Sequence, residues 1–244
     1  MFIEEVIKID QMVFAPNKDL KKIKYKELEI FREGWQKIQL DDIPTGNKVV
    51  QEIKLIQQEV KGASADAIRQ YINCDEDASY YIKQYMDDHD LDYDDDKIEY
   101  IEDQCRPIIR HYKNYYNRAR PYQVAAALDI PFERFKTDTA KTPSYPSGHT
   151  VQPVLVAEYY GKLYPQHRAG LLKGAKICGY GRVIAGLHYP SDYEAGVKLA
   201  EELIDFVDFG QLNEDAPVNA TGDGISMPPT MKKKKKKYEV LKRK

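Results

Sequence analysis

The sequence contains no apolar run long enough to cross a membrane. Its longest apolar segments, at residues 151–157 and 199–207, are short or interrupted by charged residues, whereas a membrane-spanning helix needs about 20 apolar residues. The first residues are acidic at Glu4 and Glu5 and carry neither the basic nor the apolar region of a secretory signal. Together with a charged fraction of 31%, these absences predict a soluble, cytoplasmic protein without a transmembrane segment.

Cysteine is scarce, because the 244 residues include only Cys74, Cys105 and Cys178. The three are widely spaced and form no C-x-x-C pair, so the sequence indicates neither a disulfide framework nor a zinc site. We expect all three to be reduced and buried. Acidic residues at positions 88, 90, 92 and 99 follow the spacing of a calcium-binding loop, but Tyr93 stands where such a loop requires a glycine. We therefore expect no bound metal.

Strand signals are also few, since alternating β-branched runs joined by Asn-Gly or Asp-Gly turns are missing and apolar residues recur at spacings of three and four. This pattern predicts an all-α protein. The helices are expected over residues 19–40, 47–61, 64–73, 75–88, 94–118, 122–128, 149–164, 166–187 and 189–209.

The chain length suits a single domain, which we place at residues 1–210. Residues 211–244 are rich in Gly, Pro, Asn and Asp and then in lysine, with six consecutive lysines at 232–237. Such a composition cannot bury enough apolar surface to become ordered. We expect a flexible tail, whose lysines could contact nucleic acid or anionic lipid. The oligomeric state stays open.

The first cluster of candidate functional residues is Lys113, Arg120 and Pro121. Seven residues correspond to almost two full helical turns, so a continuous helix would place Lys113 and Arg120 on one face, about 10 Å apart along its axis. Pro121 is expected to end that helix and to leave Arg120 beside the following loop. The arrangement predicts a site for an oxyanion.

The second cluster is Pro146, Ser147, Gly148 and His149, at the end of an irregular stretch over residues 131–148. Gly148 can adopt backbone angles that other residues avoid. The backbone N–H groups of residues 147–149 are therefore expected to form an anion-binding concavity that opens into the next helix. His149 would lie at the rim of this concavity, where an imidazolium can donate a proton to a departing oxygen.

The third cluster contains Arg182, His188, Pro190 and Asp192. Pro190 suits the first turn of a helix and Asp192 its acidic N-terminal turn, which places His188 just ahead of the helix. A carboxylate four residues further on can bind one imidazole nitrogen and fix the tautomer. The other nitrogen then faces the site as a nucleophile.

In order and spacing, the three clusters resemble the signature motifs of the type 2 phosphatidic acid phosphatases (PAP2). The matching patterns are Lys113-x6-Arg120-Pro121, Pro146-Ser147-Gly148-His149 and Arg182-x5-His188-x3-Asp192. The same superfamily includes bacterial class A acid phosphatases and vanadium haloperoxidases. The resemblance implies a helical bundle of the PAP2/haloperoxidase type, with a motif-bearing core at about residues 94–209.

The resemblance also implies a role for each matched residue. His188 is expected to be the nucleophile that forms a phosphohistidine, Asp192 its orienting partner and His149 the acid that protonates the leaving group. The residues expected to hold the phosphate are Lys113, Arg120, Ser147, Gly148 and Arg182. The implied activity is hydrolysis of a phosphomonoester or pyrophosphate, as in a PAP2-type acid phosphatase, with a small phosphorylated substrate and no cofactor.

Two alternatives keep the same pocket and change its use. A vanadate-dependent haloperoxidase would use His188 as the axial ligand of vanadate and His149 as the acid–base residue. A non-catalytic protein would bind a phosphate-containing partner without turnover. The chain also departs from the family at Gly181, because the family usually has a serine before the arginine of its third motif. The sequence does not identify the physiological substrate.

Overall fold

The computed structural model describes residues 12–14 and 28–214. In these residues the chain forms helices and loops, and the β-type pairing is limited to two isolated bridges, Val13 with Arg118 and Phe31 with Val207. The α-helices are α2 (Asn47–Gly62), α3 (Ala65–Glu76), α4 (Tyr80–Asp88), α5 (Asp95–Tyr116), α6 (Pro121–Ala127), α7 (Gly148–Leu163), α8 (Arg168–Ile184), α9 (Pro190–Leu203) and α10 (Phe209–Glu214). Single 3-10 turns are η2 (Trp35–Lys37), η3 (Pro165–His167) and η4 (Ile204–Phe206). The all-α prediction is confirmed.

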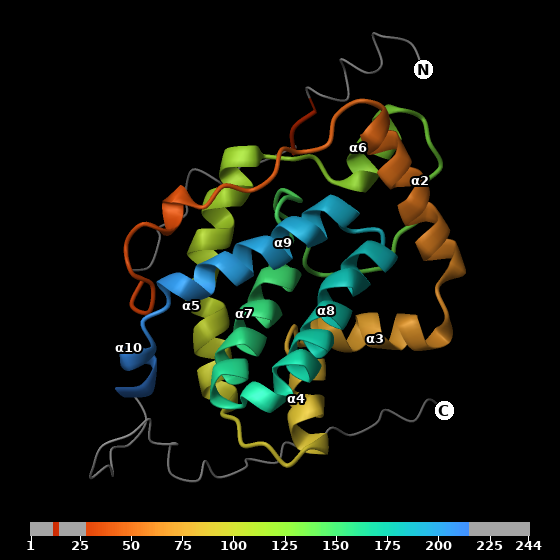
Figure 1. The fold of residues 1–244 in the computed structure, drawn as a ribbon. Coiled ribbons are helices and arrows are strands. Elements are labelled where there is room, and N and C mark those ends of the chain that lie inside the picture. The colour runs from red at the N-terminus through yellow and green to blue at the C-terminus, as the bar shows by residue number, and fades with distance from the viewer. Residues whose placement is uncertain (1–11, 15–27, 215–244) are drawn as a thin grey trace, which may run out of the picture.

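The helix α7 forms the centre of the fold. It lies between α5 and α8, and α9 crosses the same group of helices (Figure 1). Residues 150–161 of α7 are buried without interruption, as expected of a helix that is apolar all round and packed on every side. The N-terminal end of α7, which carries the second motif, is thereby held against the helices that carry the other two.

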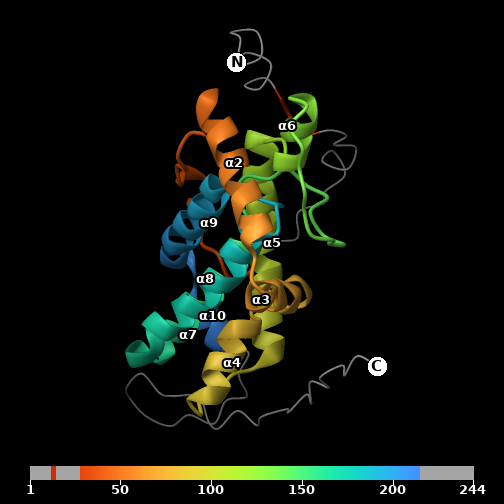
Figure 2. The same ribbon diagram turned by 90° about the vertical axis from the view of Figure 1, so that its right-hand side faces the viewer.

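The helices of the N-terminal half cover α8. Figure 2 shows α2, α3 and α4 following one another along this helix, and all three contact it. The contact with α4 requires a glycine, because a Cβ atom at Gly174 would lie 2.8 Å from the carbonyl oxygen of Tyr81. The elements that precede the motifs therefore form one wall around the helix that bears Arg182.

The prediction of a helix over residues 19–40 is wrong for residues 28–40, which the structure describes. Residues 28–40 contain only the single 3-10 turn η2. The Arg32 N–H donates to the Phe206 carbonyl and the Asp208 N–H to the Ile30 carbonyl, both at 2.8 Å, and Gly34 has a φ of 107°. Hydrogen bonds to residues 206–208 thus replace local helical hydrogen bonds. No local sequence pattern reveals this long-range pairing. Residues 19–27 lie outside the described part.

The flexible tail is expected to begin at residue 211, but residues 211–214 still belong to a helix. The helix α10 continues to Glu214, and Leu212 is buried while its carbonyl accepts a hydrogen bond from Lys97 Nζ. The remaining tail, including the lysines at 232–237, lies outside the described residues. In the described part, no helix combines the length and the apolar composition that crossing a membrane requires.

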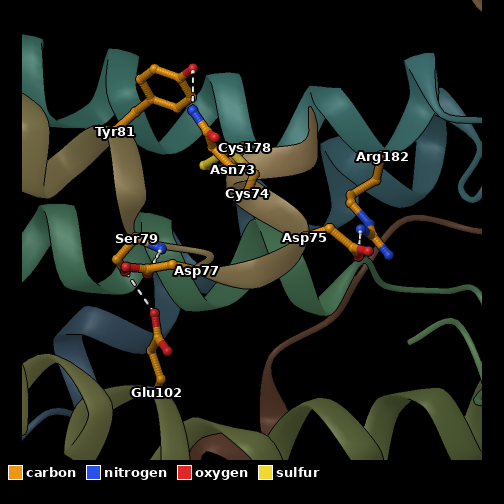
Figure 3. Close-up of a disulfide and its surroundings, with 9 residues drawn as sticks. All are labelled: Asn73, Cys74, Asp75, Asp77, Ser79, Tyr81, Glu102, Cys178 and Arg182. Atoms are coloured by element: carbon orange, nitrogen blue, oxygen red, sulfur yellow. Dashed lines mark hydrogen bonds and ion pairs between the residues drawn. A yellow bond between two sulfur atoms is a disulfide. The ribbon is translucent and has the colours of Figure 1, made fainter. Parts of the chain in front are cut away.

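The prediction that all three cysteines are reduced is wrong, because Cys74 of α3 and Cys178 of α8 form a disulfide with a Cα–Cα distance of 5.2 Å (Figure 3). Cys105 is a free, buried thiol, as expected. The two bonded cysteines are 104 residues apart in sequence, and only the packing of α3 on α8 brings them together. Structural disulfides are typical of proteins in oxidising compartments. The cytoplasmic location expected from the sequence stays a prediction.

Candidate active site

The site is built around His188 and Asp192 at the start of α9. The preceding helix α8 ends in a turn in which Gly186 has a φ of 75°, a conformation that favours glycine. His188 follows this turn, and Pro190 begins α9. Asp192 Oδ2 accepts hydrogen bonds at 3.0 Å from both His188 Nδ1 and the backbone N–H of Tyr189. One carboxylate oxygen therefore caps the helix and orients the imidazole.

The neighbours of His188 define its tautomer. Arg120 Nη1 lies 3.2 Å from His188 Nε2. Because a guanidinium has donors only, Nε2 must accept this hydrogen bond, and the ring proton of a neutral His188 is then on Nδ1, where it is donated to Asp192. Burial and the charge of Arg120 lower the pKa of His188 well below its ordinary value. The ring is thus neutral at pH 7, with the Nε2 lone pair on the side of Arg120.

Arg118 is a functional residue that the sequence pattern did not reveal. Its Nη1 lies 2.6 Å from Asp192 Oδ1 and its Nη2 lies 2.8 Å from Glu52 Oε2 of α2. The guanidinium also stacks on the Tyr189 ring, with its Cζ atom 3.7 Å from the ring centroid. Burial favours the neutral acid, but the charge of Arg118 and the hydrogen bond from His188 hold the pKa of Asp192 well below its usual range.

Lys113 and Arg120 meet in space but do not share a helix face, so that prediction is wrong. The helix α5 ends at Tyr116, because Asn117 adopts a left-handed conformation with a φ of 43°. Arg120 is instead the N-cap residue of α6, with Pro121 at the first helical position. Both cations nevertheless line one cavity of about 730 Å³, together with Gly148, His149, Arg182 and His188.

The buried cations Lys113 and Arg120 donate hydrogen bonds mainly to backbone carbonyls. Lys113 Nζ lies 3.3 Å from the Ser144 carbonyl, and Arg120 donates to the Thr142 and Leu187 carbonyls at 2.8 Å. Burial, followed by the charge of Arg120, lowers the pKa of Lys113 well below its ordinary value. Burial likewise lowers the pKa of Arg120 to about 10. Buried cations whose hydrogen-bond partners are neutral carbonyls favour an anionic ligand beside them.

Arg182 has a different environment. Its Nη1 forms an ion pair with Asp75 of α3, its Nη2 donates to Thr139 Oγ1 at 2.7 Å, and its Nε is buried without a hydrogen-bond partner among the described residues. A buried N–H without a partner costs about 1 to 3 kcal/mol. Arg182 lines the same cavity as His149 and His188, so one of its donors, unpaired among the described residues, lies beside the candidate site.

The second motif forms the start of α7, as predicted. Ser147 is the N-cap residue, and its N–H donates to the Asp192 carbonyl at 2.9 Å. This N–H is therefore not available to an anion, which corrects the expected concavity at one of its three positions. The Ser147 hydroxyl is buried without a partner in the described part of the chain. Gly148 and His149 line the cavity from the first turn of α7.

His149 faces a strongly positive surrounding. Burial lowers its pKa well below the ordinary value, and the charges of Arg182, Arg120 and Lys113 lower it further. An anion bound between these cations would remove most of this electrostatic penalty. Protonation of His149 is thus coupled to the charge of whatever occupies the cavity.

The described residues contain no cluster of three or more His, Cys, Asp or Glu side chains that could hold a metal ion. The cations that line the cavity include Lys113, Arg120 and Arg182, and carboxylates such as Glu99 and Glu102 also line it. An all-α fold with a histidine–aspartate pair and three cations around one cavity is the class of site used by enzymes that act on phosphate groups.

Comparison with known proteins shows a resemblance to one family over part of the chain. Residues 106–203 match the PAP2 superfamily model. An acid phosphatase of Zymomonas mobilis subsp. mobilis is 39% identical over 88 residues, which are 36% of this chain and 33% of that protein. Non-specific acid phosphatases of Salmonella typhimurium and Salmonella typhi are each 36% identical over 84 residues, 34% of this chain and 33% of theirs. The matched segment thus spans about a third of these relatives. Asp75 and Glu52 lie outside the matched family segment.

Proposed function

We propose that the protein is a phosphatase that hydrolyses a small phosphomonoester or pyrophosphate through a phosphohistidine intermediate. The observation that carries the proposal is the tautomer of His188. With Nδ1–H held by Asp192 at 3.0 Å and Nε2 accepting from Arg120, the lone pair of a neutral imidazole is directed to the side where the cations gather. The match to the PAP2 superfamily model and the acid phosphatase relatives support the same activity.

In the first step, His188 Nε2 attacks the phosphorus atom and the bond from phosphorus to the leaving oxygen breaks. His149 gives its proton to that oxygen, and the Nδ1–H of His188 stays with Asp192. In the second step, a water attacks the phosphohistidine, His149 takes a proton from the water, and His188 leaves as the neutral imidazole. Atoms and charges balance over the two steps, and His149 serves first as acid and then as base.

The three cations act on the charge of the transition state. Phosphoryl transfer depends mainly on positioning and on stabilising the equatorial oxygens. Lys113, Arg120 and Arg182 are buried and fixed by hydrogen bonds, so little reorganisation is needed when the substrate binds. Removal of one such donor typically costs about 2.7 to 4 kcal/mol of transition-state stabilisation.

The test is a rapid acid-free quench of the enzyme with ³²P-labelled phenyl phosphate. The expected result is a base-stable, acid-labile adduct that maps to His188 and is absent in His188→Ala. The exposed His89 provides the matched control, because His89→Ala should label like the wild type. Turnover with phosphate on another residue would contradict the proposed nucleophile. Bromide oxidation by peroxide after vanadate loading, without phosphate ester hydrolysis, would indicate a haloperoxidase instead.

A further inference from the structure

Arg182 differs from Lys113 and Arg120 because a carboxylate from outside the segment that matches the PAP2 model forms an ion pair with it. Asp75 pairs with Nη1, and Thr139 accepts from Nη2. Both terminal nitrogens are therefore engaged, and the planar guanidinium cannot rotate about its own axis. The buried Nε has no hydrogen-bond partner among the described residues.

Asp75 is itself fixed from two directions. The hydroxyl of Thr137 donates to Asp75 Oδ1 at 2.9 Å, and the hydroxyl of Thr139 lies 3.4 Å from the same oxygen. Tyr71, one turn earlier on α3, donates its hydroxyl to the Lys136 carbonyl at 2.7 Å. The irregular segment that leads to the second motif is thus tied to the same end of α3 that holds Arg182.

The disulfide fixes this end of α3 against α8. Cys178 and Arg182 are four residues apart on α8 and so lie on one face of it, while Cys74 directly precedes Asp75. Figure 3 shows the covalent link and the Asp75–Arg182 ion pair bridging the same two helices. Separation of α3 from α8 would remove the carboxylate from the arginine.

We infer that Asp75 is a positioning residue, held by the Cys74–Cys178 disulfide, which aims Arg182 at the phosphoryl group during transfer. The inference rests on the proposed phosphatase function. Asp75 carries a negative charge beside the cavity, so it does not favour binding of a phosphate in the ground state. Asp75 instead fixes the direction of the Arg182 guanidinium. Positioning of this kind stabilises the transition state more than the bound substrate.

The first experiment is Asp75→Asn, which keeps the size and the acceptor oxygen but removes the charge. We expect kcat for p-nitrophenyl phosphate to fall about tenfold or more, with KM changed less than about threefold, since misdirection of one donor lowers kcat without lowering ground-state affinity. Asp75→Glu should recover part of the loss. The matched control on the same helix is Asp66→Asn, because Asp66 pairs with Arg69 on the exposed surface and neither residue lines the cavity; it should keep the wild-type kcat.

A double-mutant cycle separates positioning from a general structural role. If Asp75 acts through Arg182, Asp75→Asn should have no further effect on kcat once Arg182→Gln is present. An equal loss in both backgrounds would overturn the inference. So would wild-type kcat in a folded Asp75→Asn protein.

The disulfide is tested with Cys74→Ser/Cys178→Ser, and Cys105→Ser serves as the control for loss of an unbonded cysteine. We expect the double variant to lower kcat in the same sense as Asp75→Asn and to add little in the Asp75→Asn background. Unchanged kcat in the folded double variant would remove the disulfide from the inference. If the double variant does not fold, the Asp75 cycle still decides the role of Asp75.

Orthovanadate binding distinguishes failure of this inference from failure of the proposed function. Vanadate mimics the trigonal-bipyramidal transition state, and transition-state mimics report on donors that act there. We expect its Kd to rise about tenfold in Asp75→Asn and to be insensitive to Asp75 when Arg182 is Gln. Wild-type protein that neither hydrolyses p-nitrophenyl phosphate nor binds vanadate would overturn both proposals. Wild-type turnover and binding that are unaffected by Asp75→Asn would overturn this one alone.

Discussion

Arg118 Nη1 lies 2.6 Å from Asp192 Oδ1, and neither side chain is more than 6% exposed. Asp192 thus divides its two oxygens between a permanent cation and the imidazole of His188. The carboxylate stays ionised through this contact, and only an ionised carboxylate holds the Nδ1–H tautomer of His188. Arg118 therefore supports the nucleophile through Asp192 and also connects it to Glu52 of α2.

We predict that Arg118→Met destabilises the protein by about 3 to 5 kcal/mol, because it leaves the buried Asp192 and the partly buried Glu52 without their cation. The pKa of Asp192 should rise in the variant, so the loss of kcat on the acid side should begin at a higher pH. Urea unfolding and the pH profile of kcat measure the two effects. Arg69→Met is the control, since its ion pair with Asp66 is exposed and lies outside the cavity and contributes at most about 1 kcal/mol. Similar behaviour of both variants would contradict this role.

The fold was predictable from periodicity wherever helix formation is local. The helices at residues 47–61 and 64–73 appear as α2 and α3 within about three residues. The prediction failed over residues 28–40, where pairing with residues 206–208 determines the backbone. It also failed at the end of α5, where a single left-handed residue, Asn117, replaces the continuous helix.

The site was predictable where residue types and spacing carry the chemistry. Lys113, Arg120, His149, Arg182 and His188 all line one cavity. Arg118 and Asp75 gave no such signal, because an arginine near a helix end and an aspartate on an amphipathic helix are ordinary surface residues in any sequence. The same holds for Cys74 and Cys178, whose pairing depends on the contact between α3 and α8.

We predict that the alkaline limb of kcat lies at higher pH than that of kcat/KM. A general acid must be protonated, so activity falls as the pH rises through the pKa of His149. That pKa is lowered in the free protein by burial and by Arg182, and a bound phosphate dianion opposes the charge of the arginine. The profile of kcat/KM reports the free protein and that of kcat the complex. Coincident limbs would contradict the coupling.

His149→Asn tests the same assignment through the leaving group. We expect kcat for phenyl phosphate to fall by about 10² to 10⁴, and kcat for p-nitrophenyl phosphate to fall much less, because nitrophenolate needs little help from a proton. His167→Asn, outside the cavity, is the control. An equal loss for both substrates would show that His149 does not protonate the leaving group.

We predict that the protein loses stability as the pH falls below about 6.5. His188 is buried and His149 is half-buried, and both have lowered pKa values, so in this range the unfolded chain takes up protons that the folded chain does not. Each histidine lowers the free energy of unfolding by up to about 1.4 kcal/mol per pH unit. Urea unfolding at pH 7, 6 and 5 measures the slope. Inorganic phosphate should oppose the loss, and His188→Asn should reduce the slope; a flat profile would contradict the prediction.

We predict that Gly181→Ser, which restores the residue usual in the family, stabilises the protein. The nearest atom to a Cβ at Gly181 is the Tyr71 Cα at 3.9 Å, so the side chain has room inside α8. Serine is about 0.5 kcal/mol better than glycine in a helix. Gly174→Ser is the contrasting variant, because its Cβ would lie 2.8 Å from the Tyr81 carbonyl, and we expect a loss of about 1 to 3 kcal/mol. Denaturant unfolding compares the two, and a destabilised Gly181→Ser protein would contradict the predicted space.

The last prediction concerns the disulfide, which joins Cys74 and Cys178 across 104 residues. A crosslink of this length restricts the unfolded chain, and we expect its removal to lower the free energy of unfolding by about 3 to 4 kcal/mol. Cys74→Ser/Cys178→Ser and wild-type protein in dithiothreitol should unfold at the same urea concentration, and the variant should not respond to the reductant. Cys105→Ser should retain the response, because Cys105 is not bonded. Wild-type stability that is unchanged by full reduction would show that packing alone holds α3 on α8.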